Sequence, residues 1–271
     1  MGDRGMGDGV MGDRTMRSRA AGNGVARSGG AHDLPGVHLR WLALDEQSLD
    51  AERLLPLLGR AEQERYRATA SAAVAERFVF GRVLLRMLVG ELLERPATAV
   101  RVVACCPRCG AAHGRPWIEG AEHLSVSIAH CRGAVVVAAS SAGVVGVDVE
   151  PADGPTDRGI AITRIAGAPF ATGGIRAADP ILHWTRIEAA LKADGRGLDL
   201  DPRLVRIHES RFAAEARIDA SRFRLAEPHL DPSLRVSVAL GDVGGGAGPI
   251  IGWRREHGDA LEDSLVSAGG R

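Results

Sequence analysis

Lysine is almost absent from this sequence of 271 residues. Lys192 is the only lysine among 34 basic residues, so the other 33 are arginine. Such a bias toward arginine is typical of a coding background rather than of a function. A position that keeps an ammonium in this background is a candidate functional residue, because a compact point charge does a different job from a planar guanidinium.

An excess of charge is also missing, since 34 acidic residues balance the 34 basic ones. Proteins that bind nucleic acid or anionic membranes usually carry a basic surplus, so the composition argues against both kinds of partner. Long apolar runs are absent too. Stretches such as AVVVAA at 134–139 are far too short to cross a bilayer, and the N-terminus lacks the apolar segment of a secretory signal.

Cysteine is scarce, and its spacing is not that of a disulfide framework, which favours a reduced, cytoplasmic protein. The four cysteines are Cys105, Cys106, Cys109 and Cys131. In CCPRCGAAHGRP, the spacing of Cys106, Cys109 and His113 suits zinc, and a fourth ligand would have to come from another cysteine or a distant histidine. Because no second Cys-x-x-Cys follows, the sequence favours the absence of a structural zinc over its presence.

Composition divides the chain into segments. Residues 1–35 repeat Met-Gly-Asp and hold few large apolar side chains, so burial cannot offset the entropy of ordering them and we predict disorder there. The whole chain is 45% hydrophobic and 25% charged, which is enough for a sizeable core. We predict an α+β protein with two similar halves, over 36–142 and 143–255, and a loose polar tail over 256–271.

The same order of elements, a strand, a long helix and more strands, is predicted in each half. Helical spacing predicts a helix from about 60 to 95, ended by Pro96. Asp179 and Pro180 predict the start of a second helix, which ends at Gly195. Strands are predicted at 37–44, 100–103, 124–130, 134–140 and 144–150 and within 203–210, 221–228 and 234–240. Residues 151–179 lack periodicity and are predicted to be irregular.

Two acids in VVGVDVEP share one face of a strand. Because side chains alternate along a strand, Asp148 and Glu150 project to one side while Val147 and Val149 project to the other. Adjacent carboxylates repel each other unless a cation lies between them, and Mg²⁺ prefers such oxygen ligands. A solvent-exposed strand end before Pro151 is an equally good explanation of these two residues alone.

The predicted helix over 180–194 (PILHWTRIEAALKAD) has an apolar stripe made by Trp184, Ile187 and Leu191. Glu188 and Lys192 lie four residues apart on the flank of that stripe. An ordinary surface pair is the simplest interpretation, yet arginine would serve such a pair equally well. The isolated lysine instead favours a contact with a phosphate.

A set of basic residues could match a polyanion. Two arginines, Arg82 and Arg86, lie four apart on one face of the first long helix. Arg115 is presented by the turn in HGRPW, and His130 ends the strand in SVSIAHCRG. The full set is Arg77, Arg82, Arg86, Arg115 and His130.

Two of these segments together resemble the signature of the Sfp-type 4′-phosphopantetheinyl transferases. GVDVEP followed by WTRIEAALKADGRGL is similar to G-[VI]-D-[VI]-E and W-x-x-x-E-[AS]-x-x-K. FVFGRVLLR, CPRCGAAHGRP and SVSIAHC are similar to upstream family segments, in the same order. The resemblance covers about 37–241, and it implies a pseudo-two-fold α+β fold with coenzyme A bound between the halves.

The resemblance also implies roles for the candidate residues, which are these: Mg²⁺ ligands Asp148, Glu150 and Glu188; catalytic Glu188 and Lys192; coenzyme A contacts Arg82, Arg86, Arg115, His130 and Lys192. A serine of an apo acyl- or peptidyl-carrier protein would attack the β-phosphate of coenzyme A, with Glu188 as base, and 3′,5′-ADP would leave. A monomer is implied, because one chain supplies both halves.

The sequence departs from the family in three places. Ile187 replaces a usual lysine, Ala129 replaces a frequent serine, and the F-[ST]-x-x-E segment is not evident, since APFATGG within 160–179 lacks its glutamate. Three alternatives therefore stay open. They are a degenerate homologue that binds coenzyme A or carrier without efficient catalysis, an unrelated Mg²⁺-dependent phosphohydrolase, and a zinc module appended to either.

Overall fold

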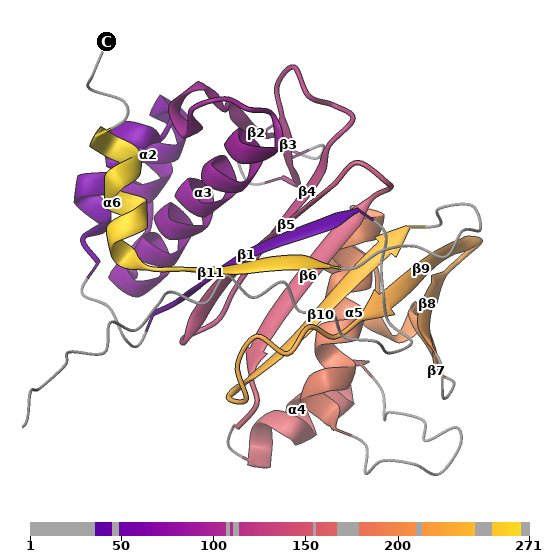
Figure 1. Ribbon diagram of the computed structural model, residues 1–271. Coiled ribbons are helices and arrows are strands. Elements are labelled where there is room, and N and C mark those ends of the chain that lie inside the picture. Colours follow the sequence, from indigo (N-terminus) through magenta and orange to yellow (C-terminus); the bar gives the residue numbers. More distant parts are fainter. Residues whose placement is uncertain are drawn as a thin grey trace, which may run out of the picture.

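The computed structural model describes a mixed α+β protein in which two sheets each carry one long helix (Figure 1). The described residues are 36–44, 49–106, 109–110, 114–153, 156–166, 179–209, 213–241 and 251–266. The segment predicted to be disordered, 1–35, lies outside them. No helix within the described ranges is long and apolar enough to span a membrane.

The first half is built around helix α3. Its elements are β1 (Val37–Ala43), α1 (Ala51–Leu54), α2 (Arg60–Ala68), α3 (Ala72–Leu92), β2 (Val102–Ala104), β3 (Pro116–Ile118), β4 (Ser125–His130) and β5 (Ala134–Ser140). The helix predicted over 60–95 is therefore two helices, because Thr69 is extended and Ser71 begins α3. The apolar residues of α3 pack on β5 to form the first core.

The second half is built around helix α5. Its elements are β6 (Val145–Pro151), α4 (Thr156–Ala166), α5 (Pro180–Asp194), β7 (Arg206–Glu209), β8 (Ala214–Ile218), β9 (Ser221–Ala226) and β10 (Leu234–Gly241). The bounds of α5 match the prediction, since Asp179 accepts hydrogen bonds from the backbone of Ile181 and Leu182, and Gly195 has a φ of 93°. That left-handed conformation suits glycine at a helix end.

The two sheets share a strand order. In the first sheet the order is β11-β1-β5-β4, and in the second it is β6-β10-β9-β8-β7. In the first half β1 pairs with β5, and β5 pairs with β4. In the second half β6 pairs with β10 in the same way, and β10 pairs with β9. Both sets of pairings are antiparallel.

The halves meet through the sheet faces that point away from the helices. Val145, Val147 and Val149 of β6 are buried there in a cluster shared with β1, β5 and β10. Strand β4 lies along β6, where the hydroxyls of Ser125 and Ser127 accept hydrogen bonds from β6 backbone N–H groups at 2.8 and 3.1 Å. The alternation predicted for β6 therefore holds, and its other face is turned toward α5.

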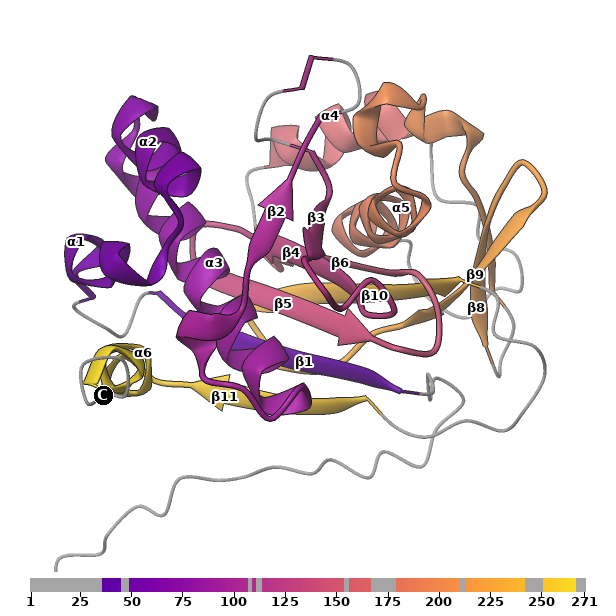
Figure 2. The ribbon, with the colours of Figure 1, turned by 90° about the horizontal axis from the view of Figure 1, so that it is seen from above.

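A small hairpin, β2–β3, completes the junction. Figure 2 shows it between α3 and α5. Arg115, next to β3, donates from Nη1 to the carbonyl of Ala193 at 3.2 Å and from Nη2 to Ser125 Oγ at 2.8 Å. This arginine thus ties the hairpin to the last turn of α5 and to β4.

Two predictions of irregular structure differ from what is observed. Helix α4 occupies Thr156–Ala166, within the stretch 151–179 predicted to be irregular, because Ile162 and Ala166 bury against α5. Helix α6 (Gly258–Val266) occupies the tail predicted to be loose over 256–271, and strand β11 (Gly252–Glu256), which falls almost wholly in the predicted second half, joins the sheet of the first half instead. β11 pairs in parallel with β1, and Leu261 of α6 is buried in the first core.

Candidate functional site

The glycine of the GVDVE segment lets α5 lie directly on β6. A Cβ atom built on Gly146 would stand 2.0 Å from the carbonyl oxygen of Ala189 and 2.5 Å from the backbone nitrogen of Ala193. No side chain fits in that space, and the facing helix positions are alanines. This close contact is what brings the flank of α5 to the acids of β6.

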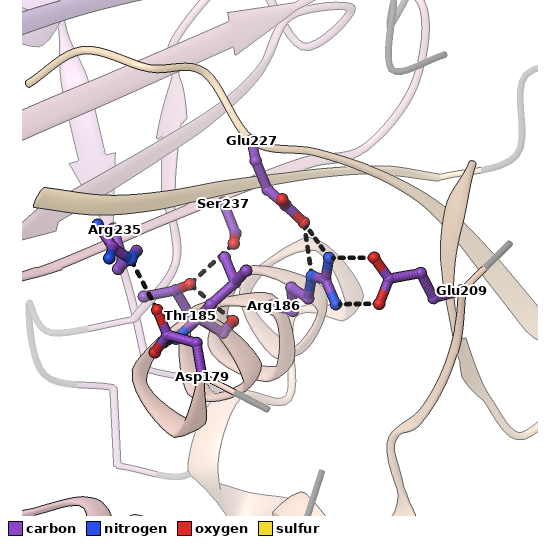
Figure 3. Close-up of polar contacts among 8 residues, drawn as sticks. Asp179, Thr185, Arg186, Glu209, Glu227, Arg235 and Ser237 are labelled. Carbon is purple, nitrogen blue, oxygen red and sulfur yellow. Dashed lines mark hydrogen bonds and ion pairs between the residues drawn. The ribbon is translucent and has the colours of Figure 1, made fainter. Parts of the chain in front are cut away.

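The N-terminal end of α5 is fixed to β10. Asp179 caps the helix with Oδ1 and accepts from Arg235 Nε at 2.7 Å with Oδ2 (Figure 3). Arg235 is the register partner of Glu150 across β10 and β6. The helix start is therefore positioned from the strand next to one of the predicted metal ligands.

A buried hydroxyl pair fixes the next turn. Thr185 Oγ1 and Ser237 Oγ are 2.8 Å apart, both residues are fully buried, and Ser237 is the register partner of Asp148 (Figure 3). Thr185 donates its only hydroxyl proton to the carbonyl of Leu182 at 3.0 Å, so Ser237 is the donor between the two hydroxyls. The Ser237 proton is thus directed toward α5, away from Asp148.

Arg186 anchors the opposite flank of the helix. Its guanidinium makes a bidentate contact with Glu209 at 3.0 and 3.1 Å, and Nε donates to Glu227 at 2.6 Å (Figure 3). The arginine is buried, so these charge-assisted bonds offset the cost of removing it from water. The rotation of α5 about its axis is fixed from both sides.

Lys192 meets Asp148 at the centre of this arrangement. Its Nζ donates to Asp148 Oδ1 at 2.7 Å and to the carbonyl of Val147 at 3.1 Å. Asp148 is 7% exposed, and its Oδ2 is buried with no hydrogen-bond partner among the described residues. The exposed strand end considered for this acid is therefore excluded, and one oxygen of a buried carboxylate is left for a further cation.

Glu150 and Glu188 complete an acidic site, defined here as Asp148, Glu150, Glu188 and Lys192. Glu150 forms an ion pair with Arg158 of α4. Burial raises the pKa of Glu188, Lys192 opposes that rise, and the charges of Asp148 and Glu150 add to it. The helix and the strand thus bring all four sequence-predicted residues within electrostatic reach of one another.

The pKa of Asp148 is also raised. Burial is the largest cause, the attraction and hydrogen bond of Lys192 oppose it, and the negative charge of Glu150 adds to it. A carboxylate in such surroundings gains strongly from an additional positive charge. The acidic site therefore favours a cation that has a higher charge than the Lys192 ammonium or lies closer to the carboxylates.

A second group of side chains, called here the cationic cluster, lies in the first half. It consists of Arg65, Arg77, Arg82 and His130. Arg65 and Arg82 both lie over the ring of Phe78, with Cζ to centroid distances of 4.4 and 5.2 Å. Nε of Arg77 and Nη1 of Arg82 are buried without a hydrogen-bond partner among the described residues.

The pKa of Arg82 is lowered to about 10, chiefly by burial; the attraction of Glu62 opposes this fall, and the charges of Arg86 and Arg65 contribute to it. The guanidinium still carries its charge at neutral pH, so the cluster holds a buried cation with unused donors. Such donors suit an anion with several oxygen atoms, such as a phosphate.

His130 connects the cationic cluster to the acidic site. The residue is exposed at the end of β4, yet desolvation of its ring is the largest cause of a lowered pKa, followed by the charges of Arg77 and Lys192. The imidazole is therefore neutral at pH 7. An anion bound beside it would favour its protonated form.

Two predicted coenzyme A contacts lie elsewhere. Arg86 is buried, binds Glu62 from Nη2 at 2.5 Å and donates from Nη1 to the carbonyl of Arg82 at 3.2 Å. Arg115 donates hydrogen bonds to α5 and β4, as described above. The structure places Arg82 and His130 each within electrostatic reach of Arg65, and leaves Arg86 and Arg115 in structural contacts.

No three histidine, cysteine, aspartate or glutamate side chains in the described ranges converge as a ready metal site. The predicted Mg²⁺ acids Asp148 and Glu150 are instead each held by a cation of the chain. Of the predicted zinc set, Cys106 is buried, Cys109 is exposed, and His113 lies outside the described residues.

Sequence reasoning missed Arg158 and Arg65. Arg158 lies in a stretch without apolar periodicity, and nothing in the sequence pairs it with Glu150. Arg65 lies on α2 with no spacing that relates it to α3, although an arginine 13 residues before Phe78 is visible in the sequence. Both reach the site only through helix packing.

Comparison with known proteins finds no family model that matches this chain and no curated protein that matches it significantly.

Proposed function

We propose that this protein is a Mg²⁺-dependent 4′-phosphopantetheinyl transferase, which moves the phosphopantetheine arm of coenzyme A to a serine of an apo acyl- or peptidyl-carrier protein. One observation carries the proposal. The motif residues Asp148, Glu150, Glu188 and Lys192 meet on β6 and α5, next to a cationic cluster with unused donors. Acids for a divalent cation and cations for a polyanion thus lie side by side.

The shared strand order of the two sheets supports the matching fold proposal. The two halves correspond strand for strand in β1, β5 and β4 and in β6, β10 and β9. A pseudo-two-fold fold of this family would place coenzyme A between them, and the charge of Lys192 in the second half acts on His130 in the first.

The residues of the acidic site fit a divalent cation. Within the described part of the chain, Asp148 Oδ2 is buried without a hydrogen-bond partner, Glu150 is partly exposed, and Glu188 is coupled electrostatically to both. Mg²⁺ held by these three acids would supply positive charge to the pyrophosphate oxygens during transfer. The oxygen donor set is the one that Mg²⁺ prefers.

The chain's own residues would then perform the transfer. Lys192 would bind the pyrophosphate, and Arg77, Arg82 and His130 would bind the phosphate at the other end of the nucleotide. The serine oxygen forms a bond to the β-phosphorus, the bond from that phosphorus to the oxygen of 3′,5′-ADP breaks, and Glu188 takes the serine proton. Burial raises the pKa of Glu188, and a cation held at the same carboxylate would oppose that rise.

A transfer assay tests the proposal. The protein is incubated with coenzyme A, Mg²⁺ and an apo carrier protein, and the carrier is weighed by mass spectrometry, with a parallel reaction in chelator. We expect the phosphopantetheine increment only with the metal. Its absence on several different carriers would contradict the proposal, and coenzyme A binding retained in that case would favour the degenerate homologue. Release of phosphate without a carrier would favour a phosphohydrolase.

Replacing Lys192 by arginine is expected to lower the transfer rate about tenfold, because a planar guanidinium cannot approach the pyrophosphate as a compact point charge in the way that the ammonium does. The rate is measured with saturating coenzyme A and carrier. Full activity of K192R would show that the ammonium is not required.

Two arginines on α3 are expected to respond differently to replacement by glutamine. Arg77→Gln should raise the KM for coenzyme A about tenfold with little change in stability, because its Nε has no hydrogen-bond partner among the residues that the structure describes. Arg86→Gln should instead lower the free energy of unfolding by about 2 kcal/mol, since it leaves buried Glu62 with less compensation. Steady-state kinetics and urea unfolding measure the two effects, and equal KM values would contradict the assignment of Arg77.

A further inference from the structure

Each acid of β6 in the acidic site is neutralised by a cation of the chain itself. Lys192 reaches Asp148 from α5, and Arg158 reaches Glu150 from α4. The two cations come from different helices that pack on each other and approach the same strand. The sequence signature accounts for Lys192 and the two acids, whereas nothing in it accounts for Arg158.

These contacts leave the site with a charge imbalance. Asp148, Glu150 and Glu188 carry three negative charges when ionised, and the two cations supply two positive charges. Asp148 Oδ2 remains buried, and no described residue hydrogen-bonds to it. The two paired acids are therefore stable together without a metal, but a cation of higher charge would satisfy the remaining oxygen better.

We propose that Lys192 and Arg158 are internal counterions that compete with a divalent cation for Asp148 and Glu150. Binding of the cation displaces both side chains from the acids and frees them for an anionic ligand. The inference depends on the proposed function only for the identity of the cation as Mg²⁺. By linkage, an anion that binds the freed side chains raises the affinity for the cation by the same factor by which the cation raises the affinity for the anion.

The geometry makes both displacements practicable. The side chain of Lys192 is 28% exposed and that of Arg158 is 31% exposed, so each has a path to solvent, and the side chain of Asp148 keeps an exposed fraction of 10%. Lys192 can leave by rotating a flexible four-carbon stem that carries three rotatable donors. The only lysine of the chain thus lies at a carboxylate that its ammonium binds in the absence of the divalent cation and must release when that cation binds.

The test is a titration with Mg²⁺ alone, at constant ionic strength, by isothermal calorimetry. It compares the unaltered protein with Lys192→Met, Arg158→Gln and Arg164→Gln. Arg164 is an exposed arginine of α4. Its replacement by glutamine is the matched control, because that substitution removes the same charge from the same helix. We expect K192M and R158Q each to bind Mg²⁺ about fivefold to tenfold more tightly, and R164Q to change affinity less than about twofold.

Thermal unfolding gives a second readout that does not require catalysis. Without Mg²⁺, R158Q and K192M should melt at lower temperatures than the unaltered protein, because the acids repel each other without their counterions. Saturating Mg²⁺ should raise their melting temperatures more than that of the unaltered protein. If K192M does not fold, Lys192→Gln and R158Q carry the same comparison.

The outcomes separate this inference from the proposed function. Unchanged or weaker Mg²⁺ affinity in both variants, relative to R164Q, overturns the inference even if the unaltered protein transfers phosphopantetheine. Tighter binding in both variants supports it even if no carrier is modified. Absence of Mg²⁺ binding in all four proteins overturns it as well.

Discussion

Replacing Gly146 by alanine is expected to lower the free energy of unfolding by about 3 kcal/mol or more and to abolish transfer activity. The added Cβ would stand 2.0 Å from the carbonyl oxygen of Ala189 and 2.5 Å from the nitrogen of Ala193. Both are backbone atoms of α5, so no side chain can rotate away, and the helix must move as a body. Movement of α5 separates Glu188 and Lys192 from β6.

Gly252→Ala is the matched control for this substitution. Gly252 also lies in a strand, and its Cβ would meet only His38 Nδ1, at 3.9 Å, which is ordinary contact. Its effect should stay within about 1 kcal/mol. Urea unfolding and the transfer assay measure both variants. A G146A protein as stable as G252A would contradict the close contact between α5 and β6.

Asp148→Asn is expected to reduce transfer activity about 100-fold or more, because the amide cannot supply negative charge to a divalent cation at the centre of the acidic site. Stability should change by less than about 1 kcal/mol, since the neutral amide avoids the burial of a charge while it loses the ion pair with Lys192. The large loss of rate with little change in stability identifies a chemical role.

The control is Asp153→Asn, an exposed aspartate just beyond β6 with the same change of charge. It should keep full transfer activity. The measurement is kcat/KM for the carrier at saturating coenzyme A and Mg²⁺, together with urea unfolding of each variant. Equal rates for D148N and D153N would exclude Asp148 from the reaction.

Local signals predicted helix α5 and its neighbouring strand accurately. Asp179, Pro180 and Gly195 determine where the helix begins and ends through the backbone groups next to them, so no distant residue is needed. Alternation along β6 likewise placed Asp148 on the face opposite Val147, and the apolar stripe of α5 placed Lys192 on its flank. These predictions depend only on how side-chain directions repeat along a single helix or strand.

The partners of these residues were not predictable in the same way. Helical spacing placed Arg82 and Arg86 on one face, but only the packing of α2 on α3 supplies Glu62, which holds Arg86. Because Lys192 is the only lysine of the chain, the sequence indicated that it is a functional residue. It did not predict the contact of Lys192 with Asp148, which depends on how closely α5 approaches Gly146. Contacts between elements distant in sequence are fixed by packing, which one sequence does not reveal.

The secondary structure missed near the end of the chain has the same cause. The GWRRE segment of β11 has no apolar alternation strong enough to indicate a strand, and its stability comes from pairing with β1. Arg40 of β1 forms an ion pair with Glu256 of β11 at 2.9 Å, and both residues are buried. A strand of this kind becomes recognisable only when its partner is known.

The parallel pairing of β11 with β1 has a consequence for the order of synthesis. Strand β1 leaves the ribosome early, but the strand that covers its edge follows the whole second half, about 210 residues later by the register of Leu42 with Glu256. Until then, the edge of β1 and the surface that receives Leu261 stay exposed on the nascent chain. The first half therefore completes its sheet last, and a ribosome stalled after β10 would hold a chain with an open sheet edge that is prone to aggregation.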